Sequence, residues 1–124
     1  MNPPSIKAGC IFCRVVAGVL PAAKVAETEK ILAFRDRNPS APQHVLLIPK
    51  AHIADSVADL ATNESEVAQT WVELLAVAQQ VASSSPEFAD GWRLVTNVGE
   101  NGSQSVFHLH VHLLGGRQMT WPPG

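Results

Sequence analysis

Three histidines alternate with aliphatic residues in the run His-Leu-His-Val-His-Leu-Leu over 108–114. A period of two is typical of a β-strand, so His108, His110 and His112 share one face and the aliphatic residues share the other. Neighbours on such a face lie about 7 Å apart. Imidazole can act as nucleophile, proton carrier or metal ligand near neutral pH. The run therefore predicts a strand over 106–114 that presents reactive nitrogens from a rigid support.

The three histidines leave two chemical interpretations open. A purely structural role is disfavoured, because burying three imidazoles without partners would cost several kcal/mol. In one interpretation they bind a catalytic zinc ion that activates a water molecule. In the other, one histidine attacks phosphorus while its neighbours orient it.

A polar loop with two glycines, 97–105, immediately precedes the histidines. Glycine lets backbone N–H groups turn toward an anion, and such concave loops bind phosphate. Asn97 and Ser105, at its two ends, can supply further donors. Alone, the loop is more typical of an ordinary connection between strands. Beside three histidines on one face, it favours a site that holds a phosphoryl group.

The only cysteines of the sequence, Cys10 and Cys13, form a C-x-x-C pair. The pair is open to three interpretations: a redox couple, half of a zinc site, or two small apolar core residues. The redox couple is disfavoured, because only nine residues with two prolines and a glycine precede Cys10, which leaves little room for the strand that such a motif requires. Spacing alone does not decide between the other two.

The rest of the pattern predicts an α+β fold, an antiparallel sheet of about five strands with one long helix on one side and a short N-terminal helix. We expect the short helix over 11–17, strands over 24–27, 31–36, 44–48 (stopped by Pro49), 92–96 and 106–114, and one or two helical turns within 52–60. Asn63 and Glu66 have capping-box spacing before the long helix. Its apolar stripe is interpreted as core, and comprises Val67, Trp71, Leu74, Leu75, Ala78, Val81 and Ala82.

Size and composition predict one domain over 1–124, with 46% hydrophobic and 16% charged residues. The net charge is −2 and there is no basic run, which argues against a nucleic-acid partner. No stretch reads as a signal peptide or a membrane span, so we expect a cytoplasmic protein with no membrane partner.

The sequence resembles the histidine triad (HIT) superfamily, whose signature is His-φ-His-φ-His-φ-φ with φ apolar. Residues 108–114 match it fully, and the likeness covers nearly the whole chain. The ending 115–124 is similar to the Hint branch, the nucleoside phosphoramidases. Further matching blocks are Ile11-Phe12 with Pro21-Ala22, Ala33-Phe34-Arg35-Asp36, Ala41-Pro42-Gln43-His44, Ile48-Pro49-Lys50, Asn97 and Gln104-Ser105-Val106-Phe107.

The resemblance implies a catalytic role for four residues. His110 is expected to attack the α-phosphorus and form a nucleotidyl-histidine intermediate, while its other ring nitrogen keeps a proton on a fixed acceptor. His112 is expected to hold phosphate oxygens, and Ser105 to bond a phosphate oxygen or the departing group. His44 is expected to orient the triad from behind. Two displacements then replace one harder step, and this chemistry requires no metal.

The resemblance also implies a purine nucleotide pocket. Asp36 is expected to accept hydrogen bonds from the ribose hydroxyls, and Asn97 to assist near the phosphate, which His110, His112 and Ser105 contact. Phe12, Val15 and Phe34 are expected to form the apolar walls around the base.

Some HIT proteins, and the related galactose-1-phosphate uridylyltransferases, carry a structural zinc ion. The matching ligand positions here are Cys10, Cys13, His52 and His108, a Cys₂His₂ set suited to a closed tetrahedral site. In this arrangement His108 binds zinc while His110 stays free for chemistry.

Family members of this type are homodimers, so we expect a symmetric dimer. The helix face around Trp71 is a candidate interface, and Trp121 is expected to reach the partner's site. Arg37, Ser40 and Ser103 depart from the family pattern, where an aliphatic residue, glutamine and glycine are usual. Arg37 leaves the base preference open.

The leading hypothesis is therefore a hydrolase of purine nucleoside 5′-phosphoramidates, which cleaves the P–N bond. Three alternatives stay open: a hydrolase of dinucleoside polyphosphates or adenylylsulfate, a nucleotide-binding adaptor with weak catalysis, and a three-histidine metallohydrolase.

Overall fold

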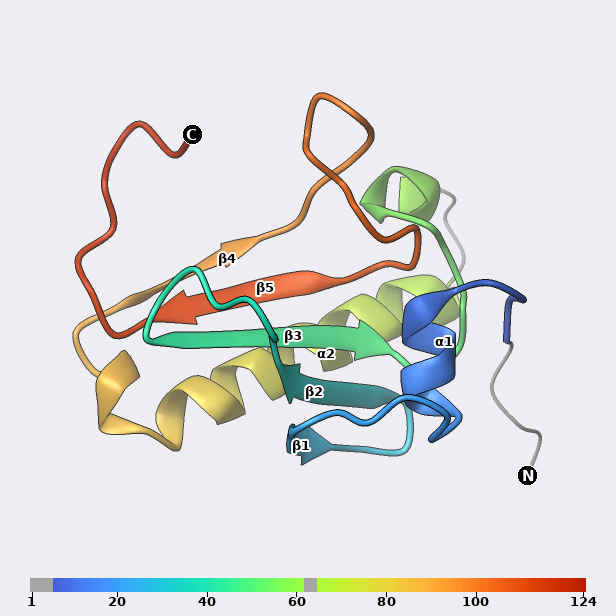
Figure 1. Ribbon diagram of the computed structural model, residues 1–124, viewed down its shortest axis with the longest axis horizontal. Coiled ribbons are helices and arrows are strands. Elements are labelled where there is room, and N and C mark those ends of the chain that lie inside the picture. The colour runs from blue at the N-terminus through green and yellow to red at the C-terminus, as the bar shows by residue number, and fades with distance from the viewer. Residues whose placement is uncertain (1–5, 62–64) are drawn as a thin grey trace.

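One antiparallel sheet organises the chain in the computed structural model, which describes residues 6–61 and 65–124. Its five strands lie in the order β1-β2-β3-β5-β4 (Figure 1). The strands are β1 (Lys24–Glu27), β2 (Ile31–Arg35), β3 (Gln43–Pro49), β4 (Trp92–Val95) and β5 (Val111–Gly115). The predicted α+β class and the number of strands are confirmed.

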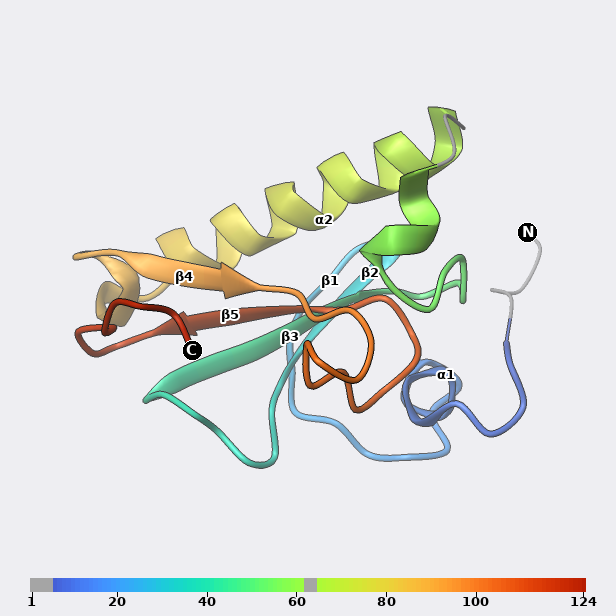
Figure 2. The same ribbon diagram turned by 90° about the horizontal axis from the view of Figure 1, so that it is seen from above.

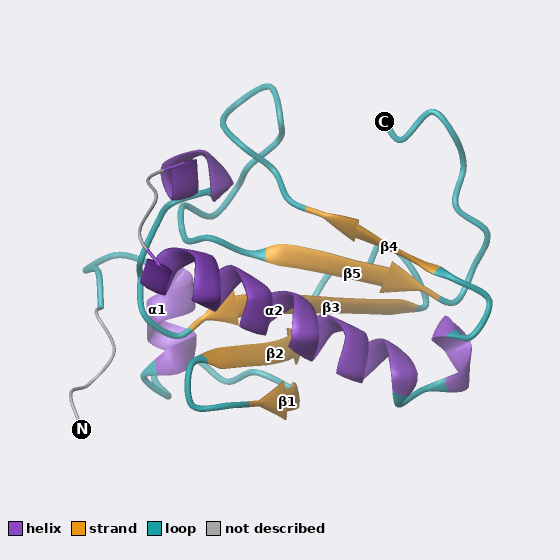
Figure 3. Cartoon of the chain, turned by 180° about the vertical axis from the view of Figure 1, so that it is seen from behind, coloured by secondary structure: helices purple, strands orange, loops and turns teal. Residues whose placement is uncertain are grey.

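The two α-helices lie on opposite faces of the sheet (Figure 2). The long helix α2 (Ser65–Ser83) runs across one face, as Figure 3 shows from behind. The short helix α1 (Ile11–Val16) packs on the other face, near the end where β3 finishes. Short 3₁₀ helices, η1 (Val57–Ala61) and η2 (Pro86–Phe88), complete the described elements.

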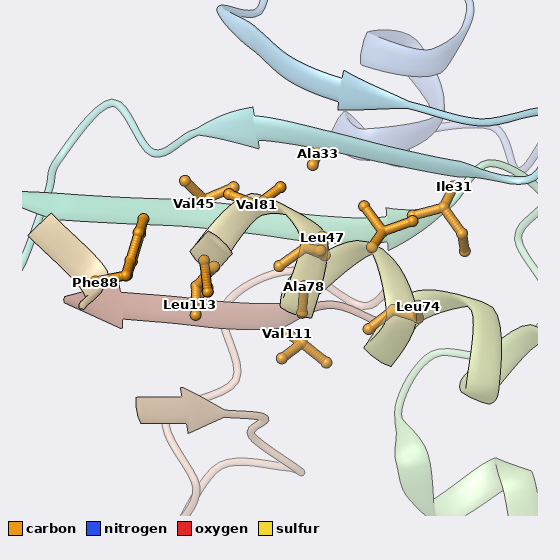
Figure 4. Packing of buried hydrophobic residues seen from close by; sticks show 12 residues of the cluster. Ile31, Ala33, Val45, Leu47, Leu74, Ala78, Val81, Phe88, Val111 and Leu113 are labelled. Carbon is orange, nitrogen blue, oxygen red and sulfur yellow. The ribbon is translucent and has the colours of Figure 1, made fainter. Parts of the chain in front are cut away.

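Alternation along the central strands separates two hydrophobic clusters. Val45 and Leu47 of β3 face α2, together with Val111 and Leu113 of β5 (Figure 4). Leu46 and Ile48, the residues between and beyond them, pack instead with α1. The β-branched and leucine side chains on both faces keep the centre of the sheet dry, so β3 and β5 form a rigid base for the polar residues they carry.

The stripe predicted for α2 is largely core. Leu74, Ala78, Val81 and Ala82 are buried against the sheet, Trp71 packs on the same cluster, and Val67 is half-buried. Leu75 is wrong as a core residue, because 36% of it is exposed, and Val77 takes its place at 4%. The predicted cap at Asn63 lies outside the described residues.

The histidine strand begins later than predicted. β5 starts at Val111 rather than at residue 106, so of the three histidines only His112 lies within it. The register that pairs Leu47 with Val111 would place Leu109 opposite Pro49, which has no N–H to give to a ladder. Leu109 donates its own N–H to Ala54 O at 2.9 Å instead.

Smaller differences concern element ends. Pro49 is the last residue of β3 rather than the residue after it, and β2 ends one residue early, at Arg35. The helical turn expected within 52–60 forms only from Val57. Across the described ranges, no helix combines the length and apolarity that crossing a bilayer requires.

Candidate active site and metal cluster

A pocket of about 530 Å³ opens on the sheet face that carries α1. Phe12, Val15 and Phe34, the residues predicted to surround a base, are among those that line it. Phe12 meets Phe34 edge to face at 5.6 Å between ring centroids, and it meets His110 in the same way at 5.1 Å. These buried rings give the pocket an apolar wall, and the adjoining histidines give it polar groups.

His110 lines the pocket with one ring nitrogen fixed by the backbone. Its Nδ1 lies 2.7 Å from His108 O, and a carbonyl can only accept, so Nδ1 carries the proton. Nε2 is then the bare nitrogen of the neutral ring. The Thr96 hydroxyl donates to His110 O at 2.9 Å and steadies the same residue. Burial lowers the pKa of His110, which keeps the ring neutral at pH 7.

A chain of two hydrogen bonds sets the protonation of His112. Ser40 donates its backbone N–H to His44 Nδ1 at 3.0 Å, so the proton of neutral His44 sits on Nε2. His44 Nε2 lies 2.9 Å from His112 Nδ1, which must therefore accept. Neutral His112 then carries its proton on Nε2, as a donor for a ligand. Burial, with the nearby His110 and His44 rings, lowers the pKa of His112 to about 4.

Asp36 joins the pocket to this chain. It lines the pocket, and its Oδ2 lies 3.4 Å from His44 Nε2. Its Oδ1 accepts the Asn38 N–H at 2.8 Å, which fixes the carboxylate at the turn after β2. Burial lowers the pKa of His44, while Asp36 acts in the opposite direction.

Of the remaining residues that the sequence analysis singled out, some line the pocket and others do not. Ser105 lines the pocket and so does the exposed Arg37. Asn97 is half-buried after β4 and lies outside the lining of the pocket. Trp121 is 81% exposed in the C-terminal segment.

Gln104 holds the glycine loop, a role that sequence reasoning did not assign. Its side-chain oxygen accepts the Gly99 N–H at 3.0 Å, and its nitrogen donates to Asp55 O at 2.6 Å. The loop is tight as well: a Cβ on Gly102 would lie 2.5 Å from Val98 O. Ser103 adopts a φ of 61°, which explains why glycine is usual at this position. The only sequence signal for Gln104 was its place in a matching block.

The four predicted metal ligands converge at the N-terminal side of the histidine run. The ligand atoms of Cys10, Cys13, His52 and His108 all lie within 4.8 Å of one another. Nδ1 of His108 is 3.3 Å from Cys10 Sγ and 3.6 Å from Cys13 Sγ, and Nδ1 of His52 is 3.4 Å from Cys13 Sγ. A tetrahedron with Zn–S and Zn–N bonds of about 2.3 and 2.0 Å has S–N edges of about 3.5 Å, so the set fits zinc.

The surroundings of the cluster also suit a metal. His108 Nε2 donates to Pro49 O at 2.8 Å, and His52 Nε2 to Asp55 Oδ1 at 2.7 Å, so both Nδ1 atoms are bare. Backbone N–H groups of Cys13 and Lys7 point at the two sulfurs, each at 3.3 Å. Burial raises the pKa of the Cys13 thiol, whereas a redox couple needs a lowered one.

Comparison with known proteins decides the family. The HIT domain family model matches residues 17–119. The chain belongs to the HIT domain family.

A relative of this HIT protein from Zea mays, named 14 kDa zinc-binding protein, is 49% identical over 92% of the chain and 87% of the relative. A relative from Arabidopsis thaliana, named adenylylsulfatase HINT1, is 45% identical over 92% of the chain and 76% of the relative. A solved HIT family hydrolase from Legionella pneumophila Philadelphia 1 is 46% identical with a TM-score of 0.85, over 94% of the chain and 100% of that structure. The predicted family and its fold are thus confirmed.

Proposed function

We propose that this HIT protein is a nucleotide-binding hydrolase that cleaves the P–N bond of purine nucleoside 5′-phosphoramidates. The observation that carries the proposal is the bare Nε2 of His110 in a pocket that Phe12 and Phe34 also line. A planar base fits against aromatic and aliphatic walls, and a phosphorus atom fits beside the histidines. The hydrolase names of structural neighbours support the reaction class.

The first step is attack by the His110 Nε2 lone pair on the α-phosphorus. A bond forms between Nε2 and phosphorus, the bond from phosphorus to the leaving nitrogen breaks, and the amine departs after accepting a proton. We assign the Ser105 hydroxyl to pass that proton from solvent, and its exposed position in the pocket lining supports this role. The imidazole becomes cationic, and its Nδ1–H stays on His108 O.

The second step is attack by water on the same phosphorus. Its hydroxyl stays on phosphorus, its proton returns to solvent, and His110 leaves as the neutral ring with the nucleoside monophosphate as product. His112 donates from Nε2 to a phosphate oxygen in both steps, and Asp36 accepts from the ribose hydroxyls. Splitting the displacement in two in this way is the usual advantage of a covalent intermediate.

We further propose that Cys10, Cys13, His52 and His108 hold a zinc ion that ties the N-terminal segment to the histidine run. A closed Cys₂His₂ site of this kind supplies folding free energy rather than an activated water. The name of the Zea mays relative supports this assignment. Loss of the ion should lower stability more than it lowers the rate of an intact molecule.

The deciding experiment uses His110→Ala and a purine nucleoside phosphoramidate. We expect turnover to fall at least about a thousandfold while nucleoside monophosphate still binds. Mass spectrometry of wild-type protein quenched during turnover should find a nucleotidyl adduct on His110. Near-normal turnover by the variant refutes the covalent mechanism. Negligible turnover of every substrate by the wild type, with nucleotide bound, favours the adaptor instead.

A second candidate is hydrolysis of adenylylsulfate, which the name of the Arabidopsis thaliana relative favours. The same nucleophile and pocket serve both, because only the leaving group differs. Comparing kcat/KM for the phosphoramidate and for adenylylsulfate on one preparation decides between them.

We also propose a homodimer. Val72 and Leu75 of α2 are 64% and 36% exposed, and β4 is an edge strand that carries Trp92 at 42%. Exposed apolar side chains and an unpaired strand edge are both features that isologous contacts bury. Light scattering should give a molar mass twice that of one chain. Val72→Glu should lower the measured mass toward that of a single chain.

A further inference from the structure

A second, smaller hollow adjoins the nucleotide pocket. It has a volume of about 230 Å³ and is lined by residues 7–11 and 105–107; we call it the exit groove. Ile11, Ser105 and Val106 line both hollows. His110 lines only the nucleotide pocket. Ser105 therefore lies at the boundary between the region around His110 and the exit groove.

The walls of the exit groove are mainly apolar although they face solvent. Phe107 and Ile11 are 56% and 51% exposed, and Val106 and Ala8 lie beside them. Single exposed apolar residues need no explanation, but a phenyl ring and a branched side chain gathered at the rim of a polar site do. Lys7 is the one charged residue of the lining, and its Nζ is 3.5 Å from Asp55 Oδ1.

The chain holds this wall in place from below. The Lys7 N–H donates to Cys13 Sγ at 3.3 Å, and the Cys10 N–H donates to Lys7 O at 3.2 Å. Gln104 anchors the opposite side through Asp55 O and Val106 O. The groove is therefore built by the cluster and by the glycine loop, and does not depend on one side-chain rotamer.

The chemistry of displacement at phosphorus says what belongs there. Attacking and leaving atoms lie roughly in line on opposite sides of the phosphorus. With His110 on one side, the leaving group lies on the side away from it, past the phosphate oxygens that Ser105 reaches. The hollow that continues the nucleotide pocket past Ser105 is the exit groove.

We propose that the exit groove binds the leaving amine and selects amines with an apolar body over polar ones and over cationic ones. This inference rests on the proposed phosphoramidate hydrolysis, and it adds a binding site for the amine part of the substrate. Apolar contact with Phe107, Ile11 and Val106 favours the apolar body. A second ammonium group would lose water there, and the lining has no carboxylate to pair with it.

The test compares phosphoramidates of one nucleoside with three leaving amines: 2-phenylethylamine, 2-methoxyethylamine and 1,4-diaminobutane. We expect kcat/KM for the phenylethyl substrate to exceed that for the methoxyethyl substrate about tenfold, and the diamine to be slowest. Phe107→Ser should reduce the phenylethyl preference to about twofold, whereas Phe107→Leu should keep most of it. Val19→Ser, which removes an exposed apolar side chain outside both hollows, is the control.

Ala8→Trp provides an independent variant, because it fills the groove from the other wall. It should slow the phenylethyl substrate and leave the methoxyethyl rate unchanged. Equal rates for all three amines in the wild type, or a preference that survives both Phe107→Ser and Ala8→Trp, overturns the groove assignment while phosphoramidate hydrolysis stands. Absence of turnover with any phosphoramidate overturns the proposed function and this inference with it.

Discussion

Replacing His44 tests the hydrogen-bond chain behind His112. His44 is 6% exposed and does not line the pocket, but it contacts His112 and Asp36, which do. In His44→Leu the Ser40 N–H, His112 Nδ1 and Asp36 Oδ2 all lose a partner at once. In His44→Gln the amide oxygen can accept from Ser40, and the amide nitrogen can donate to His112, so the proton pattern survives.

The size of the effect follows from the groups left without partners. An unsatisfied buried acceptor costs about 1–3 kcal/mol, which for a chain of this length is roughly 4–12 °C in Tm. His112 also loses the bond that holds its ring and its tautomer, a net loss of about 0.5–1.5 kcal/mol, or about two- to twelvefold in kcat/KM. His44→Gln should keep the rate within about threefold of wild type.

The assay is kcat/KM on a nucleoside phosphoramidate with thermal unfolding of the same samples. Nucleoside monophosphate affinity serves as a readout that a merely structural residue would not move at a temperature where every variant is folded. Equal rates for His44→Leu and wild type would refute the reasoning. So would a His44→Gln rate as low as that of His44→Leu, because the two variants differ in the proton pattern and both remove the imidazole.

Three other predictions concern metal, backbone and pH. Cys13→Ser should lower zinc affinity at least about tenfold, and chelation of wild-type protein should lower Tm; metal analysis showing full zinc in the variant would contradict this. Ser103→Gly should raise the free energy of unfolding by about 1 kcal/mol in calorimetry, because φ of 61° is strained for serine, whereas Gly102→Ala should lower it. Unfolded His112 takes up a proton near pH 6.5 and folded His112 only near its pKa of about 4, so Tm should fall as pH drops through that window, less steeply in His112→Asn.

Much of the fold was predictable because its signals are local. The helical spacing of Leu74, Ala78 and Val81 specified the buried side of α2. The two faces of β3 could not be told apart in the same way, because Val45 to Ile48 are apolar throughout and the strand is buried on both faces. The position of β5 was not predictable in the same way. It depends on Pro49, which lies about sixty residues away in sequence and would face Leu109 only if the pairing of β3 with β5 continued.

The candidate site also has a part that the sequence predicts and a part that depends on distant contacts. Residue types and the family resemblance were sufficient to name the four cluster ligands, and the structure brings all four together. The protonation of His112 was not predictable, because it is decided by a backbone N–H of Ser40 two hydrogen bonds away. The role of Gln104 was not predictable for a similar reason: its partners, Gly99 and Asp55, come close to it only in the folded chain.

His108 serves two purposes through two different parts of the residue. Its imidazole faces the sulfur atoms, and its main-chain carbonyl receives the proton of the neighbouring ring at position 110. A carbonyl is common to every amino acid, so a replacement at 108 removes a ligand without removing the acceptor. A lineage that dispensed with the ion could therefore let residue 108 drift and keep its reaction, whereas no substitute at 110 would retain the nucleophile.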